Sequence, residues 1–166
     1  MSVLEIIILG IIQGITEFLP ISSSGHLVIA QNLLGVKSPG NTLEVLFHFG
    51  TLMSVVYVFF EDIKQIFLTM NKKNNQSFTF YIIIATLPAV FAGLFLKDYF
   101  LKVFDNVHLV GFALCSTGFI LILSKRFKNS QAEIGFSSSI LVGIAQAIAI
   151  IPGISRSGST ISMCMY

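Results

Sequence analysis

Four side chains of this sequence have the types and spacing to act together on a phosphate group: Glu17, Ser23, His26 and Arg156. His26 follows Ser23 by three residues, so a helix would place both on one side, where the imidazole could serve the hydroxyl as a base or orient it. The guanidinium of Arg156 suits a phosphate, which it can bind through two parallel hydrogen bonds. The alternative for His26 is an imidazole that only bonds the backbone at a turn.

Glu17 indicates chemistry because it lies deep in an apolar run. Gln13 precedes it by four residues, so a helix would place both side chains on one face. A carboxylate inside a membrane costs about 2.5–3.5 kcal/mol on insertion scales, and it therefore needs a partner or a hydrated cavity. We favour a functional role for Glu17; the alternative is a structural ion pair with a neighbouring helix, for example with Arg156.

These residues belong to two copies of one sequence pattern. GIIQGITEFLPISSSG at 10–25 aligns without a gap with GIAQAIAIIPGISRSG at 143–158. Each copy is an apolar run broken by proline and followed by a serine-glycine turn. Such a turn is often only a helix cap, but it also presents N–H groups and hydroxyls at the positive end of a helix, where an anion binds. The candidate anion-binding residues are Ser22, Ser24, Gly25, Ser155, Ser157, Gly158 and Thr160.

The composition predicts a membrane protein. The 166 residues are 54% hydrophobic and 11% charged, with a mean hydropathy of +0.86, whereas soluble domains carry about a quarter charged residues. Complete spans are predicted at about 43–60, 78–97 and 107–124. We therefore expect an all-α polytopic protein with a single integral membrane domain over 1–166. The net charge of +2 is too small to argue for a nucleic-acid partner.

Lysine-rich connections at 61–77 and 125–134 predict that these two segments are cytoplasmic and that 35–42 and 98–106 face outward. The repeat copies, at about 1–35 and 134–166, have second arms too short to span, which favours re-entrant helix-turn-helix segments. Three intervening spans would invert one copy relative to the other. The prediction is an inverted-topology repeat whose broken helices meet near the midplane. The alternative for the first copy is a plain helical hairpin with a polar turn at the surface.

Other polar residues near the spans allow weaker interpretations. For His48, in FHFG at the start of a span, packing and site-lining roles are equally well supported. His108 and Glu44 lie at span edges, where an interfacial histidine and a solvated carboxylate are expected. Cys115 and Cys164 have no disulfide or metal spacing and are expected to pack.

Two of these motifs resemble the signatures of a known family. QGITEFLPISSSGH at 13–26 and PGISRSGST at 152–160, with FHFGTL at 47–52 between them, are similar to motifs of the bacterial undecaprenyl-diphosphatase family. The resemblance implies a plasma-membrane hydrolase, with its active site facing the outer side, that converts undecaprenyl diphosphate to undecaprenyl phosphate. That product is the lipid carrier for peptidoglycan synthesis, and the reaction lowers bacitracin sensitivity. The expected partners are the lipid substrate and the bilayer, with a homodimer as an option.

The resemblance also implies roles for individual residues. Gln13 and Glu17 take the positions of the acidic motif, where they would hold a divalent cation, Mg²⁺ or Ca²⁺; the alternative for Glu17 is to shuttle a proton. Ser23 would attack the terminal phosphorus with help from His26, with His26 or water as alternative nucleophiles, while Arg156 and the serine turns grip the diphosphate. Gln13 leaves the motif with one carboxylate, so the motif alone does not build a two-carboxylate metal site.

Two further expectations follow from comparing the chain with this pattern. Family members are longer, so the chain is expected to be truncated after the second signature, with an incomplete second hairpin. A lipid transporter or flippase, or an inactive remnant, is the competing function, because inverted repeats with broken helices also occur in transporters.

Overall fold

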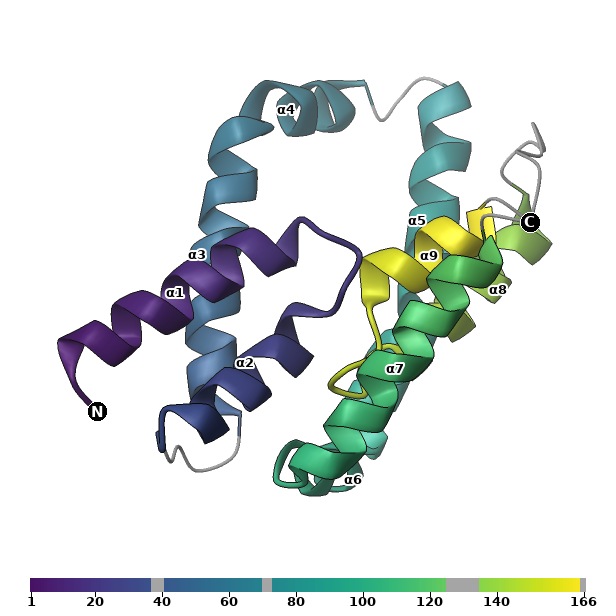
Figure 1. Cartoon of the computed structure of the whole chain (residues 1–166). Coiled ribbons are helices and arrows are strands. Elements are labelled where there is room, and N and C mark those ends of the chain that lie inside the picture. Colours follow the sequence, from purple (N-terminus) through teal and green to yellow (C-terminus); the bar gives the residue numbers. More distant parts are fainter. Residues whose placement is uncertain (37–40, 70–72, 125–134, 165–166) are drawn as a thin grey trace.

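The computed structural model describes residues 1–36, 41–69, 73–124 and 135–164, and in these residues the secondary structure is entirely helical. The helices are α1 (Val3–Glu17), α2 (Ser23–Leu33), α3 (Thr42–Val58), α4 (Phe60–Leu68), α5 (Lys73–Phe95), α6 (Lys97–Phe104), α7 (Val107–Ser124), α8 (Phe136–Ile148) and α9 (Arg156–Cys164). Figure 1 shows α3 and α5 both upright, with the chain running up along α3 and down along α5; α1 and α2 lie beside α3, and α7, α8 and α9 lie beside α5.

Two of the three predicted spans are confirmed as single helices. Within α5, residues Gln76–Phe95 are long and apolar enough to cross a membrane, and so is α7. The span predicted at 43–60 differs: α3 ends at Val58, and the chain bends by 70° into α4. Glu61 and Asp62 occupy the first turn of α4, where negative charge is favourable to the helix dipole. The charged part of the first connection thus forms a separate amphipathic helix.

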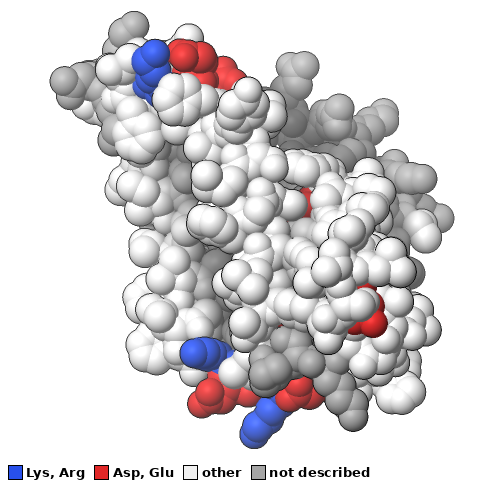
Figure 2. Space-filling model, turned by 90° about the vertical axis from the view of Figure 1, so that its left-hand side faces the viewer, with Lys and Arg blue, Asp and Glu red and all other residues white. Residues whose placement is uncertain are grey.

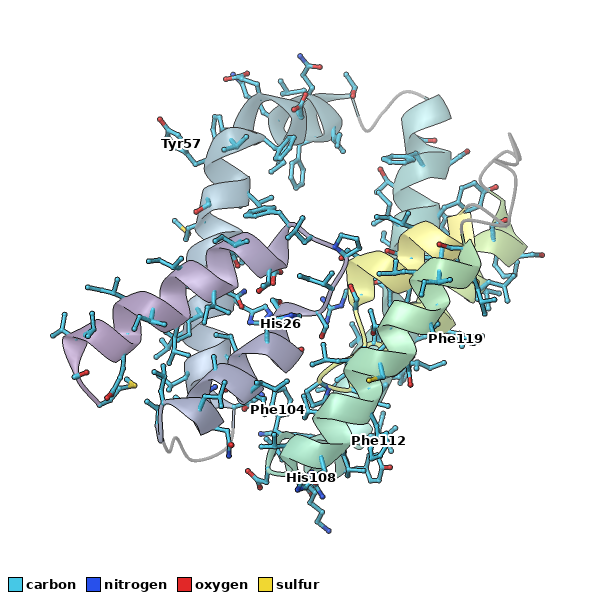
Figure 3. The ribbon with its side chains drawn as sticks, in the orientation of Figure 1. His26, Tyr57, Phe104, His108, Phe112 and Phe119 are labelled. Atoms are coloured by element: carbon cyan, nitrogen blue, oxygen red, sulfur yellow. The ribbon has the colours of Figure 1, made fainter. Side chains whose placement is uncertain are left out.

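The surface confirms a polytopic helical membrane protein. Tyr57, Phe112 and Phe119, labelled in Figure 3, are 85%, 73% and 63% exposed, as bilayer-facing side chains would be. Charged residues of α4 and α6 instead gather at the two ends of the molecule, with a broad band of mostly uncharged residues between them (Figure 2). This distribution matches a protein whose middle lies in hydrocarbon and whose ends lie in water.

Each repeat copy forms a helix-turn-helix hairpin, α1 with α2 and α8 with α9. The two serine turns have the same local hydrogen bonds. Ser22 Oγ accepts from the N–H of Gly25 at 3.4 Å, and Ser155 Oγ accepts from the N–H of Gly158 at 3.0 Å. In each copy the first serine therefore caps the second helix. The sequence repeat is a structural repeat.

The two hairpins meet through their turns, near the middle of the molecule (Figure 1). The N–H of Gly153 donates to Ser22 Oγ at 3.2 Å, linking the copies across 131 residues of sequence. A Cβ on Gly25 would lie 2.8 Å from Gly153 Cα, and a Cβ on Gly158 would lie 2.9 Å from the carbonyl oxygen of Pro20. These glycines allow a backbone approach that a larger residue would block.

Candidate active site

A cavity of about 650 Å³ lies where the two hairpins meet α3. Both repeat copies contribute to its wall. Its polar lining residues are Thr16, Glu17, Ser22, Ser23, Ser24, Asn41, Glu44, His48, Gln146, Ser155, Arg156, Ser157 and Thr160. Most of the residues singled out in the sequence are therefore in one place, although the two copies are far apart along the chain.

Glu17 and Ser23 form the centre of the first half of this site. Ser23 Oγ donates to Glu17 Oε2 at 2.5 Å, and Gln13 Nε2 donates to the same oxygen at 2.9 Å. Glu17 ends α1 and Ser23 begins α2, so the turn folds the carboxylate back onto the hydroxyl. A hydroxyl that already donates to a carboxylate has an acceptor for its proton when the oxygen attacks an electrophile.

His48 of α3 lies against both of these groups. Its Nε2 is 3.4 Å from Ser23 Oγ and 3.4 Å from Glu17 Oε2. Its Nδ1 is 2.7 Å from the carbonyl oxygen of Glu44. Because a carbonyl oxygen only accepts, Nδ1 carries a proton, and Nε2 is the ring nitrogen that faces Ser23 and Glu17 in the site. The structure thus gives His48 the site-lining role rather than a packing role.

Glu44 is buried rather than solvated, which corrects the expectation for this span edge. It is 5% exposed, and Gln31 Nε2 donates to its Oε1 at 2.5 Å. Its second carboxylate oxygen is buried without a hydrogen-bond partner among the described residues. The side-chain amide of Gln31 in α2, rather than water, is thus the partner of this carboxylate. The contact joins α2 to the start of α3, the helix that carries His48.

His26 is placed differently from the expectation. Its Nδ1 is 2.8 Å from the carbonyl oxygen of Ser22, which is the backbone-bonded alternative, and His26 is not among the residues that line the cavity. In Figure 3 it lies near the start of α2, close to the turn. The imidazole reaches back to the carbonyl four residues earlier, so it is His48, from another helix, whose ring contacts Ser23.

Arg156 supplies the positive charge of the second half of the site. Its side chain lines the cavity and is exposed, and its guanidinium forms no hydrogen bond or ion pair with any residue that the structure describes. The expected alternative, an ion pair between Glu17 and Arg156, is therefore not formed there. A guanidinium at the N-terminus of α9, without an anionic partner among the described residues, is suited to an anionic ligand.

The candidate anion-binding residues divide into three groups. Three of them line the cavity with partly exposed side chains: Ser24, Ser157 and Thr160. Ser22 and Ser155 also line the cavity, but they are only 5% and 1% exposed, and their hydroxyls cap the helices that follow. The two remaining residues, Gly25 and Gly158, are not among the lining residues; they hold the turns together instead.

Comparison with known proteins identifies the family. The family model described as Bacitracin resistance protein BacA matches residues 6–166. The chain belongs to this family. Undecaprenyl-diphosphatase of Halothermothrix orenii is 46% identical over 97% of this chain and 62% of its own length. Undecaprenyl-diphosphatase of Syntrophotalea carbinolica is 42% identical over 100% of this chain and 66% of its own. The chain thus spans about two thirds of the length of these relatives.

The BacA-family site offers few ligands for the expected divalent cation. Among the described residues, no three His, Cys, Asp or Glu side chains form a group that could hold a metal. Gln13 is 1% exposed and is not a lining residue, and its Oε1 is buried without a partner in the described part of the chain. Glu17 alone of this pair faces the cavity. One carboxylate fits a cation that takes its other oxygen ligands from bound phosphates and water, as Mg²⁺ often does.

Proposed function

We propose that the whole protein hydrolyses undecaprenyl diphosphate to undecaprenyl phosphate and inorganic phosphate. The observation that carries this proposal is the Ser23–Glu17 hydrogen bond in a cavity that Arg156 also lines. A nucleophile with its base on one repeat copy and a guanidinium on the other can bracket a phosphate group. The relatives are named for this reaction. A transporter or flippase would need to bind the lipid but would not need a hydroxyl activated by a carboxylate.

The reaction begins with the diphosphate bound by Arg156, Ser24 and Ser157. Ser23 Oγ forms a bond to the terminal phosphorus, and its proton passes to Glu17 Oε2. The bond from that phosphorus to the bridging oxygen breaks, and undecaprenyl phosphate leaves with that oxygen and its electron pair. Water then attacks the phosphorus of the phosphoserine, and the bond from that phosphorus to Ser23 Oγ breaks. One proton of the water restores the Ser23 hydroxyl, the other leaves with the inorganic phosphate, and Glu17 releases to solvent the proton that it took in the first step. Arg156 stabilises the charge on the transferred group in both steps.

The expected cation, Mg²⁺ or Ca²⁺, would be held by Glu17 together with phosphate oxygens of the substrate, next to Gln13. When bound, it would neutralise part of the diphosphate charge. The protein residues must still exclude bulk water and align the attacking oxygen with the bond that breaks.

We also propose that the two hairpins are re-entrant, that they enter the bacterial plasma membrane from opposite sides, and that the cavity is open to the outer side. The contact between the turns supports a site near the midplane, and the charged residues of α4 and α6, at opposite ends of the molecule, support spans that cross the membrane between them. Hydrolysis there would recycle the carrier for peptidoglycan synthesis and lower bacitracin sensitivity. A homodimer stays a prediction of the sequence.

Phosphate release by the purified full-length protein in detergent, with undecaprenyl diphosphate and Mg²⁺, tests the proposed function. We expect stoichiometric undecaprenyl phosphate and inorganic phosphate, and we expect Glu17→Gln to lower kcat by about 10²-fold or more because the hydroxyl loses its base. A matched control is Glu61→Gln, at an exposed position of α4 where the carboxylate bonds Lys64 and no other described residue. Intact diphosphate after incubation with folded parent protein would refute the function.

His48→Gln is expected to lower kcat by about 10-fold, the size of effect typical of a residue that orients a reacting group. The imidazole contacts both Ser23 and Glu17, but Glu17 is the closer partner of the hydroxyl, so the loss should be smaller than for Glu17→Gln. His108→Gln is the matched control, since His108 lies at the start of α7, at the bottom of Figure 3, and lines a different cavity. Equal kcat values for the two histidine variants would contradict the role of His48.

A further inference from the structure

Thr117 of α7 contacts the second hairpin turn through two buried hydrogen bonds. Its Oγ1 donates to the carbonyl oxygen of Gly153 at 2.7 Å and accepts from the N–H of Ser155 at 3.0 Å. Thr117 is 5% exposed and is not a lining residue of the active-site cavity. One hydroxyl therefore satisfies two backbone groups that would otherwise be buried without partners, a costly arrangement in a membrane protein.

The same turn is packed closely against the α7 backbone. Gly153 has a φ of +100°, and a Cβ there would lie 2.6 Å from the carbonyl oxygen of Val110 and 2.7 Å from Ala113 Cβ. Pro20 occupies the equivalent position of the first copy, and a proline cannot adopt a positive φ. The second turn therefore has a different backbone conformation from the first where it contacts α7. The two hydrogen bonds of Thr117 stabilise that conformation.

The contact of Thr117 with the second turn bears on the position of Arg156, the cationic residue of the site. Ser155, whose N–H bonds Thr117, caps α9 through the N–H of Gly158, and Arg156 is the next residue. On its other side the turn is tied to Ser22 through the N–H of Gly153. Thr117 therefore joins the start of α9 to a membrane-spanning helix, while Ser22 joins the same turn to the half of the site that holds Ser23.

We propose that Thr117 is a positioning residue for diphosphate binding, which aligns the α8–α9 turn so that Arg156 and Ser157 face Ser23 across the cavity. The proposal rests on the proposed function for the identity of the ligand. Thr117 does not touch the ligand; it acts through the backbone of Gly153 and Ser155. A displacement of about 1 Å in a binding group can cost about 10²-fold in rate. Loss of the Thr117 hydroxyl should therefore measurably weaken binding of the anion.

The test compares Thr117→Val, which keeps the side-chain shape but removes both hydrogen bonds, with Thr117→Ser, which keeps the hydroxyl. The matched control is Thr86→Val on α5, an exposed threonine whose Oγ1 bonds the carbonyl of Ile82 in its own helix. The first measurement is the Kd for inorganic pyrophosphate by calorimetry with the full-length protein, and the second is KM for undecaprenyl diphosphate.

We expect Thr117→Val to raise the Kd and the KM by at least about 10-fold, with Thr117→Ser and Thr86→Val close to the parent. In an Arg156→Ala background the effect of Thr117→Val on Kd should shrink, because the group being positioned is gone. A Thr117→Val protein with a lowered Tm but an unchanged Kd would overturn the proposal, because that pattern belongs to a structural role.

The binding measurement also separates this proposal from the proposed function. If the parent binds pyrophosphate but releases no phosphate from the lipid, the hydrolytic function fails, while the Kd comparison still decides the role of Thr117. If Thr117→Val does not fold, Thr117→Ala removes the same hydrogen bonds without burying a branched side chain, and the same Kd comparison applies.

Discussion

Ser23→Ala is expected to lower kcat for phosphate release by at least about 10³-fold, because it removes the oxygen that attacks phosphorus. Ser23 Oγ donates to Glu17 Oε2 and lies 3.4 Å from His48 Nε2, so one hydroxyl in the site has a carboxylate and an imidazole beside it. The neighbouring hydroxyls differ from it: Ser22 Oγ caps α2 and accepts from the second turn. Loss of Ser23 should therefore not be compensated from within the first turn.

A rapid-quench experiment distinguishes this role from one in binding. The parent, mixed with substrate carrying a labelled terminal phosphate, should retain label on Ser23, and mass spectrometry should locate it; Ser23→Ala should retain none while its KM changes little. Ser54→Ala is the matched control, since Ser54 is exposed on α3 and its hydroxyl donates to the carbonyl of Gly50 in its own helix. Near-parental kcat in Ser23→Ala would instead assign the attack to water or to another residue.

The elements that sequence patterns predicted well are those whose cause is local. The spans of α5 and α7 follow from uninterrupted apolar runs, and both hairpins follow from a proline next to a serine-glycine turn. The 70° bend after Val58 was missed because the apolar run continues through Phe59 and Phe60. Hydropathy alone does not separate a straight span from one that turns at the membrane surface.

The candidate site was predicted less completely, because its contacts join distant parts of the chain. Spacing could only pair Ser23 with a near neighbour such as His26, whereas the imidazole that contacts Ser23 is His48, on another helix. The signal for His48 was its place in the apolar run at 47–52, which left packing and site-lining roles open; its bond to the Glu44 carbonyl, which leaves Nε2 facing the site, is seen only in the structure. The packing roles of Gly25 and Gly158 depend on the second copy lying against the first.

Thr117 had no sequence signal at all. It is one polar residue in an apolar span, and such a residue usually bonds the carbonyl of its own helix, as Ser116 does. Only the placement of the α8–α9 turn against α7 gives it a backbone partner elsewhere. Local rules therefore predict the elements and the reactive residue types, but the residues that align them depend on tertiary packing.

Arg156→Ala is expected to lower kcat/KM by about 10³-fold, the lower end of the range for an arginine that stabilises a transferred phosphoryl group. Arg156 supplies the one arginine or lysine side chain among the described lining residues of the cavity, and its guanidinium bonds no described residue, so its charge is available to the ligand. Its removal also leaves Glu17 as a negative charge facing a diphosphate with no opposing guanidinium, which disfavours both binding and the transition state.

Arg156→Lys separates charge from geometry at this position. Lysine keeps the charge but cannot form two parallel hydrogen bonds to phosphate oxygens, so we expect part of the activity to return, mainly through a lower KM than that of Arg156→Ala. Lys102→Ala on α6 controls for the loss of a cation outside the cavity. The measurements are kcat and KM for undecaprenyl diphosphate and the Kd for inorganic pyrophosphate. If Arg156→Ala bound pyrophosphate as tightly as the parent, the diphosphate would have to lie away from the α9 N-terminus, and the two serine turns would not form one site.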